Sequence, residues 1–373
     1  MSFGIGDFTP HFQWLDAKRQ RVSLRQDCHA GRVTLLLVCP STAAPAQTAI
    51  ARLSARHRAF ADADVQVFVI TARPPVDGAT PSATELALFT DPGQATGKAL
   101  GFAAEGGLAI LDECGRIEHL IAACGEPEID AALAHCQDRD TDAAPGVITR
   151  QAPVLIVPNV IDADHCAKLI RVWTEGERYQ GGVAHQQAGK HVVKQDVKVR
   201  EDAALPDTGP EAQALLVLFR RRLFPEIERA FKFRVTRGET LRLGCYAADA
   251  SGHFKRHRDD TSEHVAHRRF AMSLNLNTGA YQGGQLCFPE FGSALYAPPA
   301  GAALVFSCSL LHEATPVTAG RRFVLLGFFH GEAEEAARQA RGAPYAYSRV
   351  DGKTAQSGPP LDPASMTRLP RWG

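Results

Sequence analysis

Hydrophobic runs alternate with helical patterns in the first third of the chain. Residues 33–39 (VTLLLVC) form a continuous apolar run, which is typical of a strand buried on both faces, and residues 65–71 (VQVFVIT) predict a second buried strand. Residues 47–61 place apolar side chains at helical spacing, and 126–136 predict a closing helix. Shorter strands are predicted at residues 86–91 and 108–112. Strands that alternate with helices predict an α/β sandwich with a mixed sheet.

The pattern changes after residue 152. Helices are expected at residues 163–174 and 211–231, after a short apolar run at 154–157. From residue 240 onward, short strands are separated by Gly, Pro and Asn turns; they read LRLGCY, AMSLNLN, GQLCF, AALVFS and RFVLLGFF. Short strands with frequent turns predict a double-stranded β-helix (jelly roll) with supporting helices.

The chain is too long for one ordinary domain, and its composition suggests where it divides. Residues 139–152 are polar and contain Pro145-Gly146, so they are the predicted linker between domains at 1–138 and 153–330. Residues 331–373 start with a charged helical stretch and then become rich in Pro, Gly and Ser. They predict a C-terminal tail on the surface.

Composition and charge exclude several classes of protein. The chain has 41 basic and 41 acidic residues, so no net field attracts nucleic acid or acidic membranes. The chain contains no run of 18 apolar residues, so no membrane helix is predicted. The N-terminus lacks the pattern of a signal peptide, and a cytoplasmic protein is therefore expected. The nine cysteines are scattered without a CxxC pair, which favours reduced, buried thiols over a disulfide framework. The sequence leaves the oligomeric state unknown.

The candidate chemistry centres on His257, Asp259 and His312. On a strand, residues i and i+2 point the same way, so His257 and Asp259 can reach one metal ion while Arg258 points away. His312, 53 residues after Asp259, completes a 2-His-1-carboxylate set. Such a set suits Fe(II) and leaves coordination positions open. Arg322 adds a guanidinium suited to a dicarboxylate such as 2-oxoglutarate.

The same segment resembles the iron- and 2-oxoglutarate-dependent prolyl 4-hydroxylase-like family over residues 153–330. That family's pattern is a Tyr, a Gly-containing turn, HxD, a Gly-Gly hairpin and His-x-x-x-Pro-Val-x-x-Gly-x-Lys/Arg. The corresponding residues here are Tyr246, Gly252, His257, Asp259, Gly283, Gly284, His312, Pro316, Val317, Gly320 and Arg322.

The resemblance implies an Fe(II)- and O2-dependent dioxygenase with 2-oxoglutarate as cosubstrate. It would hydroxylate a prolyl or peptidyl C–H bond, or one of a small molecule, and release succinate and CO2. His257, Asp259 and His312 would be the catalytic metal ligands, and Arg322 would bind 2-oxoglutarate, with Tyr246 as a further residue of that cavity. Asn275 and Asn277 alternate along AMSLNLN, so they are expected to point to one face and to line the same cavity. The substrate is unidentified, and a requirement for L-ascorbate stays open.

The first 135 residues resemble the peroxiredoxins, which have a thioredoxin-like fold. The resemblance is carried by residues 6–12 with the following VTLLLVCP strand, by 89–92 and by 109–117. The family places its peroxidatic cysteine seven positions after a proline, but Gln47 stands there when counted from Pro40, and Pro45 when anchored on Thr42. The resemblance therefore implies the fold without the peroxidase cysteine, and Cys39 is expected to be a core residue.

The sequence motifs also allow interpretations in other classes of protein. His-Arg-Asp also occurs in protein kinases, but His264 stands where their asparagine is expected. A thiol peroxidase centred on the first domain is the rival enzyme class. The alternative that is not an enzyme is a protein-binding module that uses the thioredoxin-like domain. His253, His264 and His267 lack a coherent ligand spacing, so they are expected at the surface or around the ligands.

Overall fold

The protein, studied as a computed structural model, divides into two compact units, Met1–Val147 and Ile148–Gly373. The structure describes residues 2–24, 29–39, 44–73, 86–103, 105–139, 147–180, 183–187, 190–194 and 197–341, of which 44–45, 183–187 and 190–194 only as backbone. The division between the units falls within the predicted linker at 139–152. Residues 140–146 of that linker, residues 342–373 of the predicted tail, and Pro40 and Thr42 lie outside the described residues.

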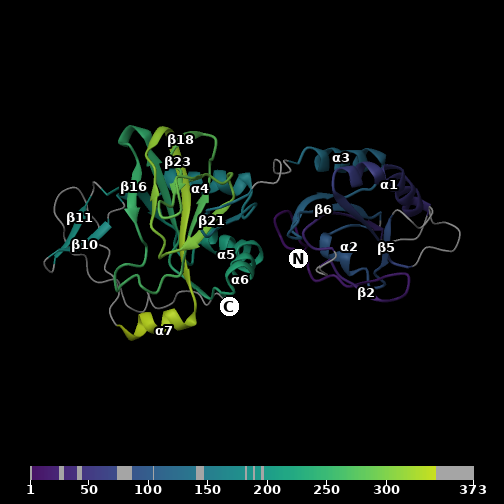
Figure 1. Ribbon diagram of the computed structural model, residues 1–373, viewed down its shortest axis with the longest axis horizontal. Coiled ribbons are helices and arrows are strands. Elements are labelled where there is room, and N and C mark those ends of the chain that lie inside the picture. The colour runs from purple at the N-terminus through teal and green to yellow at the C-terminus, as the bar shows by residue number, and fades with distance from the viewer. Residues whose placement is uncertain are drawn as a thin grey trace. The chain divides into compact units, whose positions relative to one another are not determined.

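The N-terminal unit is built on one mixed sheet, as the sequence predicts (Figure 1). Its strands within the described residues are β1 (Trp14–Leu15), β2 (Arg21–Val22), β3 (Val33–Cys39), β4 (Val65–Thr71), β5 (Ala87–Thr90), β6 (Gly107–Leu111) and β7 (Ile117–Ile121). They lie in the order β2-β1-β5-β4-β3-β6-β7. β3, β4 and β5 are parallel, whereas β6 and β7 are antiparallel to their neighbours.

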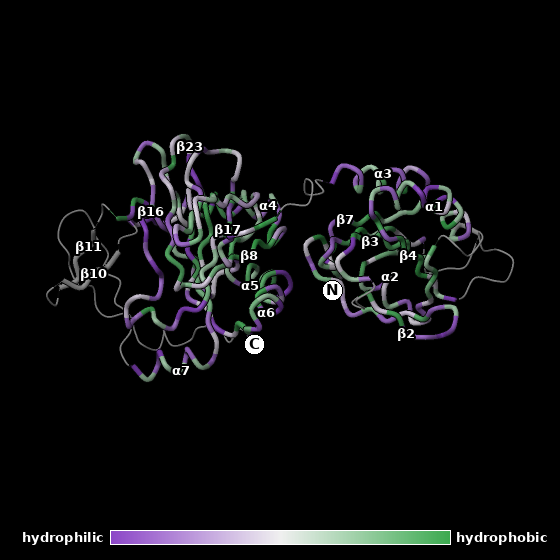
Figure 2. Tube along the Cα trace, in the orientation of Figure 1, coloured by the Kyte–Doolittle hydropathy of each residue, from purple (hydrophilic) through white to green (hydrophobic). Residues whose placement is uncertain are grey.

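Helices cover both faces of this sheet, which explains why its central strands are mostly apolar. Helices α1 (Ala44–Asp62) and α3 (Glu126–Gln137) pack on the face that presents Leu35 and Leu37. Helix α2 (Ala95–Leu100) packs with Leu36 and Val38 on the other face. Figure 2 shows hydrophobic residues gathered along β3 and β4. Alternate side chains of one strand thus enter two separate cores.

The C-terminal unit contains two larger antiparallel sheets. In the described residues, the nine-stranded sheet consists of β8 (Val154–Val157), β21 (Ala303–Ser307), β17 (Phe270–Asn275), β23 (Val317–His330), β15 (Arg242–Ala247), β13 (Glu201–Ala204) and β9 (Tyr179–Gln180), in that order, with β14 (Arg237–Gly238) and β18 (Tyr281–Gly283) also paired to β23. The five-stranded sheet has the order β12 (Lys198–Val199), β16 (His253–His257), β22 (His312–Ala314), β19 (Leu286–Cys287) and β20 (Leu295–Tyr296). Strands β10 (Val183–Gln187) and β11 (Lys190–Lys194) form a separate hairpin.

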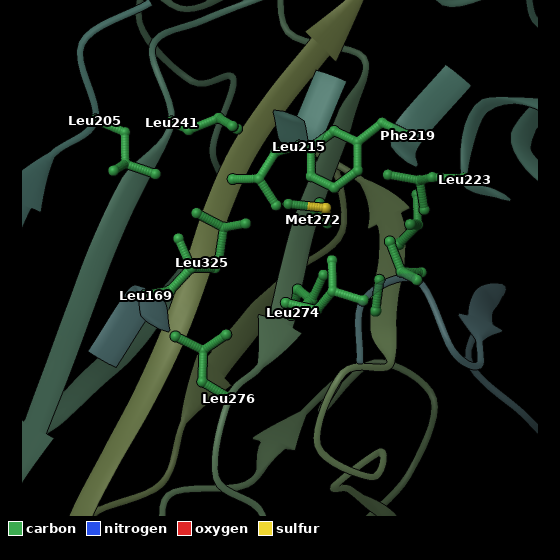
Figure 3. Packing of buried hydrophobic residues seen from close by; sticks show 14 of the residues in the cluster. Leu169, Leu205, Leu215, Phe219, Leu223, Leu241, Met272, Leu274, Leu276 and Leu325 are labelled. Carbon is green, nitrogen blue, oxygen red and sulfur yellow. The ribbon is translucent and has the colours of Figure 1, made fainter. Parts of the chain in front are cut away.

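Helices pack on one face of the nine-stranded sheet. They are α4 (Ala163–Glu175), α5 (Pro210–Arg222) and α6 (Phe224–Phe231), while α7 (Glu332–Ala340) follows β23. Figure 3 shows Met272, Leu274 and Leu325 of the sheet packed with Leu215 and Phe219 of α5. The single helix predicted at 211–231 is wrong: α5 and α6 are separate, because Pro225 has no N–H to continue the α5 hydrogen bonds and instead occupies the first turn of α6.

The opposite face of the nine-stranded sheet encloses a second core that positions the site. Along β17, Ala271, Ser273 and Asn275 alternate with the residues that face the helices. Ala271 packs in one cluster with Phe288 and Ala314, of which Ala314 belongs to β22 of the five-stranded sheet. The space between the two sheets is therefore the interior of this unit. Among the described residues, no helix combines the length and apolarity that a membrane span requires.

Candidate active site

Two neighbouring strands bring the predicted metal ligands together. His257 ends β16 and lies opposite His312, the first residue of β22. Asp259 follows β16, with its carboxylate oxygens 3.4 Å from Nε2 of His257 and 3.4 Å from Nε2 of His312. One donor atom from each residue lies within 4.8 Å of the other two, and this is the sole such group of three among the described residues.

Backbone carbonyls set the orientation of both imidazoles. Nδ1 of His257 lies 2.7 Å from the carbonyl oxygen of Lys255, and Nδ1 of His312 lies 2.9 Å from that of Leu310. Because a carbonyl only accepts hydrogen bonds, each Nδ1 carries the proton and donates it. Each Nε2 lone pair is then directed toward Asp259, as a metal-binding imidazole requires.

The charge state of the three residues also suits a divalent cation. Burial raises the pKa of Asp259, but His257, His312 and Arg268 beside the carboxylate outweigh it and bring that pKa to about 2. Burial lowers the pKa of His312. At neutral pH the group therefore offers one carboxylate and a neutral His312 imidazole, the forms in which these side chains bind metals. Arg258, which was predicted to point away from the ligands, pairs with Glu290.

Arg322 is buried in the same interior without a matching negative charge. Its side chain, on β23, is 2 % exposed, and Nη2 donates to Ser273 Oγ at 3.2 Å and to Asn275 Oδ1 at 3.1 Å. Asn275 Nδ2 donates to the carbonyl of Pro298, which fixes its Oδ1 toward Arg322. Within the described chain no carboxylate pairs with Arg322, and its Nε finds no acceptor. A buried guanidinium in this state fits the carboxylate of a ligand.

The Gly-Gly hairpin of the motif leaves room for this guanidinium. Gly283 and Gly284 have φ of 74° and 71°, the left-handed region that favours glycine. A Cβ added at Gly284 would lie 3.0 Å from Cδ of Arg322 and 2.8 Å from Cγ2 of Val317. The second glycine is therefore required both by the backbone conformation and by the position of Arg322.

We expect Gly284→Ala to destabilise the C-terminal unit by about 1–3 kcal/mol more than Gly279→Ala. Both substitutions place alanine at positive φ, but the space around Gly279 is open, with no atom within 4 Å of an added Cβ. The difference therefore isolates the clash with Arg322 and Val317. Urea unfolding of the two variants measures it. Equal free energies of unfolding would contradict the close packing described here.

Tyr246 connects Arg322 to charged residues that sequence analysis missed. Tyr246, on β15, accepts a hydrogen bond from Arg200 Nη1 at 3.0 Å. The Cζ atoms of Arg200 and Arg322 lie 5.4 Å and 5.3 Å from the centre of the Tyr246 ring. Because the phenolic oxygen accepts from Arg200, its own O–H is left to donate. The expected role of Tyr246 as a donor in this cavity thus stays a prediction.

Lys198, Arg200 and Asp202 form a buried ionic cluster between the two sheets. Arg200 Nη2 lies 2.8 Å from Asp202 Oδ2, and Lys198 Nζ lies 3.1 Å from the same oxygen. A Cβ on Gly244 would approach Arg200 Cδ to 2.9 Å, so that glycine makes room for the cluster. The segment KVRED looks like a solvent-exposed run of charges. The sequence signal that could have revealed the cluster is the alternation of its charged residues, because residues 198, 200 and 202 lie on one face of an extended segment.

The remaining polar candidates lie outside the group of His257, Asp259 and His312, which is called the metal group below. His267 is buried and pairs with Glu239, at 3.1 Å, and His253 Nδ1 lies 2.7 Å from the carbonyl of Ser251. Asn277, expected to share a face with Asn275, instead bonds to the backbone of Arg321 and Phe323 in β23. Of the two asparagines, only Asn275 contacts Arg322.

Comparisons with known proteins bear on both parts of the chain. Residues 241–330 match the family model of the 2OG-Fe(II) oxygenase superfamily. Similar solved structures include a Pseudomonas putida prolyl-4-hydroxylase, with 21% identity, 48% of this chain and 94% of that chain covered, and a TM-score of 0.39. A Trichoplax adhaerens prolyl hydroxylase, in complex with a hypoxia inducible factor peptide fragment, has 16% identity over 52% of this chain and 89% of its own, with a TM-score of 0.40.

A Xanthomonas campestris peroxiredoxin Q is also similar, with 16% identity, 34% of this chain and 90% of that chain covered, and a TM-score of 0.30. No curated protein matches the chain. The resemblance predicted for the C-terminal segment is thus confirmed by the match of residues 241–330 to the 2OG-Fe(II) oxygenase superfamily.

Proposed function

We propose that the C-terminal unit is an Fe(II)- and 2-oxoglutarate-dependent dioxygenase, whose two antiparallel sheets form a double-stranded β-helix. The observation that carries the proposal is the presence, in one interior, of a three-residue metal group and an uncompensated buried arginine. His312 packs against Phe306, with ring centres 4.7 Å apart, and Arg322 lies against Tyr246. Phe306 and Tyr246 belong to the same core between the sheets.

His257, Asp259 and His312 would hold the iron through the two Nε2 atoms and the carboxylate. Three protein ligands leave the remaining coordination positions for cosubstrate and oxygen. When bound, the iron supplies the oxidation that hydroxylates an unactivated C–H bond, while 2-oxoglutarate is converted to succinate and CO2.

The residues around Arg322 would hold the far carboxylate of 2-oxoglutarate. Arg322 supplies the charge, and Ser273 and Asn275 hold its Nη2 so that its partnerless Nε stays available. Tyr246 would donate its hydroxyl in the same cavity. A keto acid that is anchored at both ends presents one geometry to the metal, which favours productive binding.

The substrate of the proposed reaction is a prolyl or peptidyl residue, or a small molecule, as the sequence motif suggests. L-Ascorbate is proposed as an accessory reductant on the same basis. Domains at 1–138 and 153–330, with a linker at 139–152, complete the proposed organisation.

The proposal is tested by following succinate formation by the full chain. With Fe(II), O2 and 2-oxoglutarate, we expect slow succinate release without any substrate, because the cosubstrate can be consumed unproductively. Omitting iron, or adding a chelator, should bring the rate to background, and restoring Fe(II) should recover it. Succinate release that is insensitive to the chelator would contradict an iron-dependent reaction. Candidate peptides that accelerate release then identify the substrate class.

A further inference from the structure

Two cysteines of the N-terminal unit meet at one edge of its sheet. Cys39 is the last residue of β3, and Cys124 follows β7 just before α3. Strand β6 lies between β3 and β7, and Val38 lies opposite Gly107, the first residue of β6. The end of β3 and the end of β7 therefore both flank the start of β6, although the two cysteines are far apart in sequence.

Side-chain contacts bring the two thiols together at this edge. Continuing the register of β3 and β6 by one residue places Cys39 opposite Gly106. Sγ of Cys124 lies 3.4 Å from the carbonyl oxygen of Glu105, the residue before Gly106. Cys124 packs against the hydrophobic cluster that contains Cys39, and the two thiols are close enough for each to shift the pKa of the other.

The two thiols differ in accessibility and in acidity. Cys39 is 2 % exposed, whereas Cys124 is half-buried. The neighbouring Cys39 thiol lowers the pKa of Cys124 to about 7, assisted by Arg52 and opposed by burial and Glu128. The same contact, together with burial, raises the pKa of Cys39. Cys124 is therefore the nucleophile of the pair, and Cys39 is its shielded neighbour.

We propose that Cys39 and Cys124 form a reversible dithiol–disulfide site that exchanges with low-molecular-weight disulfides. The site differs from the position at which the resemblance to peroxiredoxins would place a reactive cysteine, where the exposed Gln47 stands. The proposal concerns the N-terminal unit alone, so it is independent of the proposed oxygenase reaction.

The exchange is a two-electron oxidation of the protein. The Cys124 thiolate attacks one sulfur of glutathione disulfide, the S–S bond breaks, and one glutathione thiolate leaves. Cys39 then loses its proton and attacks Sγ of Cys124, which releases the second glutathione and closes the protein disulfide. Two protein thiols are oxidised, and one glutathione disulfide is reduced to two glutathione molecules.

The test uses the reduced full chain in buffers with increasing ratios of oxidised to reduced glutathione. Samples are quenched in acid, remaining thiols are alkylated, and proteolytic peptides are analysed by mass spectrometry. We expect a disulfide-linked peptide pair that contains Cys39 and Cys124, with a mass two hydrogen atoms below the sum of the two reduced peptides. This linked pair should disappear when excess reduced glutathione is restored. Cys124→Ser should leave Cys39 reduced, and Cys39→Ser should accumulate a mixed glutathione disulfide at Cys124.

Cys114→Ser is the matched control, because that thiol is exposed and outside the pair; the linked peptide should form in it as in the parent. The proposal is overturned if Cys39 of the parent is still alkylated at a glutathione ratio that fully modifies Cys114. It is also overturned if glutathione stays on Cys124 of the parent without conversion to the linked peptide. These outcomes require only the parent protein, so they decide the question even if Cys39→Ser fails to fold.

Discussion

Asp259→Ala is expected to lose Fe(II), where the parent binds about one ion per chain. The substitution removes the one anionic ligand and leaves a divalent cation facing imidazoles in a buried site. Breaking a buried charge pair in this way costs about 3–5 kcal/mol, or more than about 100-fold in affinity. Anaerobic titration with Fe(II), followed by gel filtration and metal analysis, measures the loss.

Asp260→Ala is the control for this experiment. Asp260 is the adjacent carboxylate but accepts a hydrogen bond from Ser309 and lies outside the metal group. It should retain iron, while His312→Ala should lose it as Asp259→Ala does. If both the Asp259 and His312 variants keep one ion per chain, the three residues are not the ligands.

Arg322→Ala should weaken 2-oxoglutarate binding severely while leaving iron bound. In the proposed complex the guanidinium pairs with a desolvated carboxylate, and losing one partner of such a pair costs roughly 2–5 kcal/mol. The corresponding loss of affinity is about 30-fold to several thousand-fold. Arg322→Lys should recover part of it, because the charge survives while the planar fork is lost.

The visible charge-transfer band of the anaerobic Fe(II)–2-oxoglutarate chelate measures this affinity, and metal analysis of the same samples shows whether iron stays. Arg321→Ala is the matched control, since its side chain is the exposed neighbour on β23. It should bind 2-oxoglutarate as the parent does. An Arg322→Ala variant with undiminished affinity would mean that the cosubstrate is anchored elsewhere.

The strands that were predicted best from the sequence are those buried on both faces, because such burial selects apolar residues along the whole strand. β3 and β4 are covered by helices on both faces, so each is a mostly apolar run whose bounds are easy to recognise in the sequence. β16 (HFKRH) and β22 (HEA) are short, polar and partly exposed, and periodicity alone predicts neither. These two strands nevertheless position the metal group. Its residues were found through ligand chemistry and motif spacing instead.

The environment of the site was harder to predict than its central residues. Arg322 and Asn275 followed from the motif and from alternation along one strand, and the structure brings them into contact. Arg200 and its partners were missed because a run of charges usually faces solvent, and only tertiary packing buries this one. The pair Cys39 and Cys124 was missed for a similar reason. Its members are brought together by sheet order, which single-sequence patterns do not reveal.

The hydrogen bonds that orient His257 and His312 have a consequence for how this site can diverge. Each ring is held by a main-chain carbonyl two residues earlier in its own segment. No second side chain is needed to choose the protonated nitrogen, so a change at position 255 or 310 leaves that acceptor in place. Mutation can therefore reshape the rim of the proposed metal site, and with it the preference for a substrate, while the two imidazoles keep their orientation.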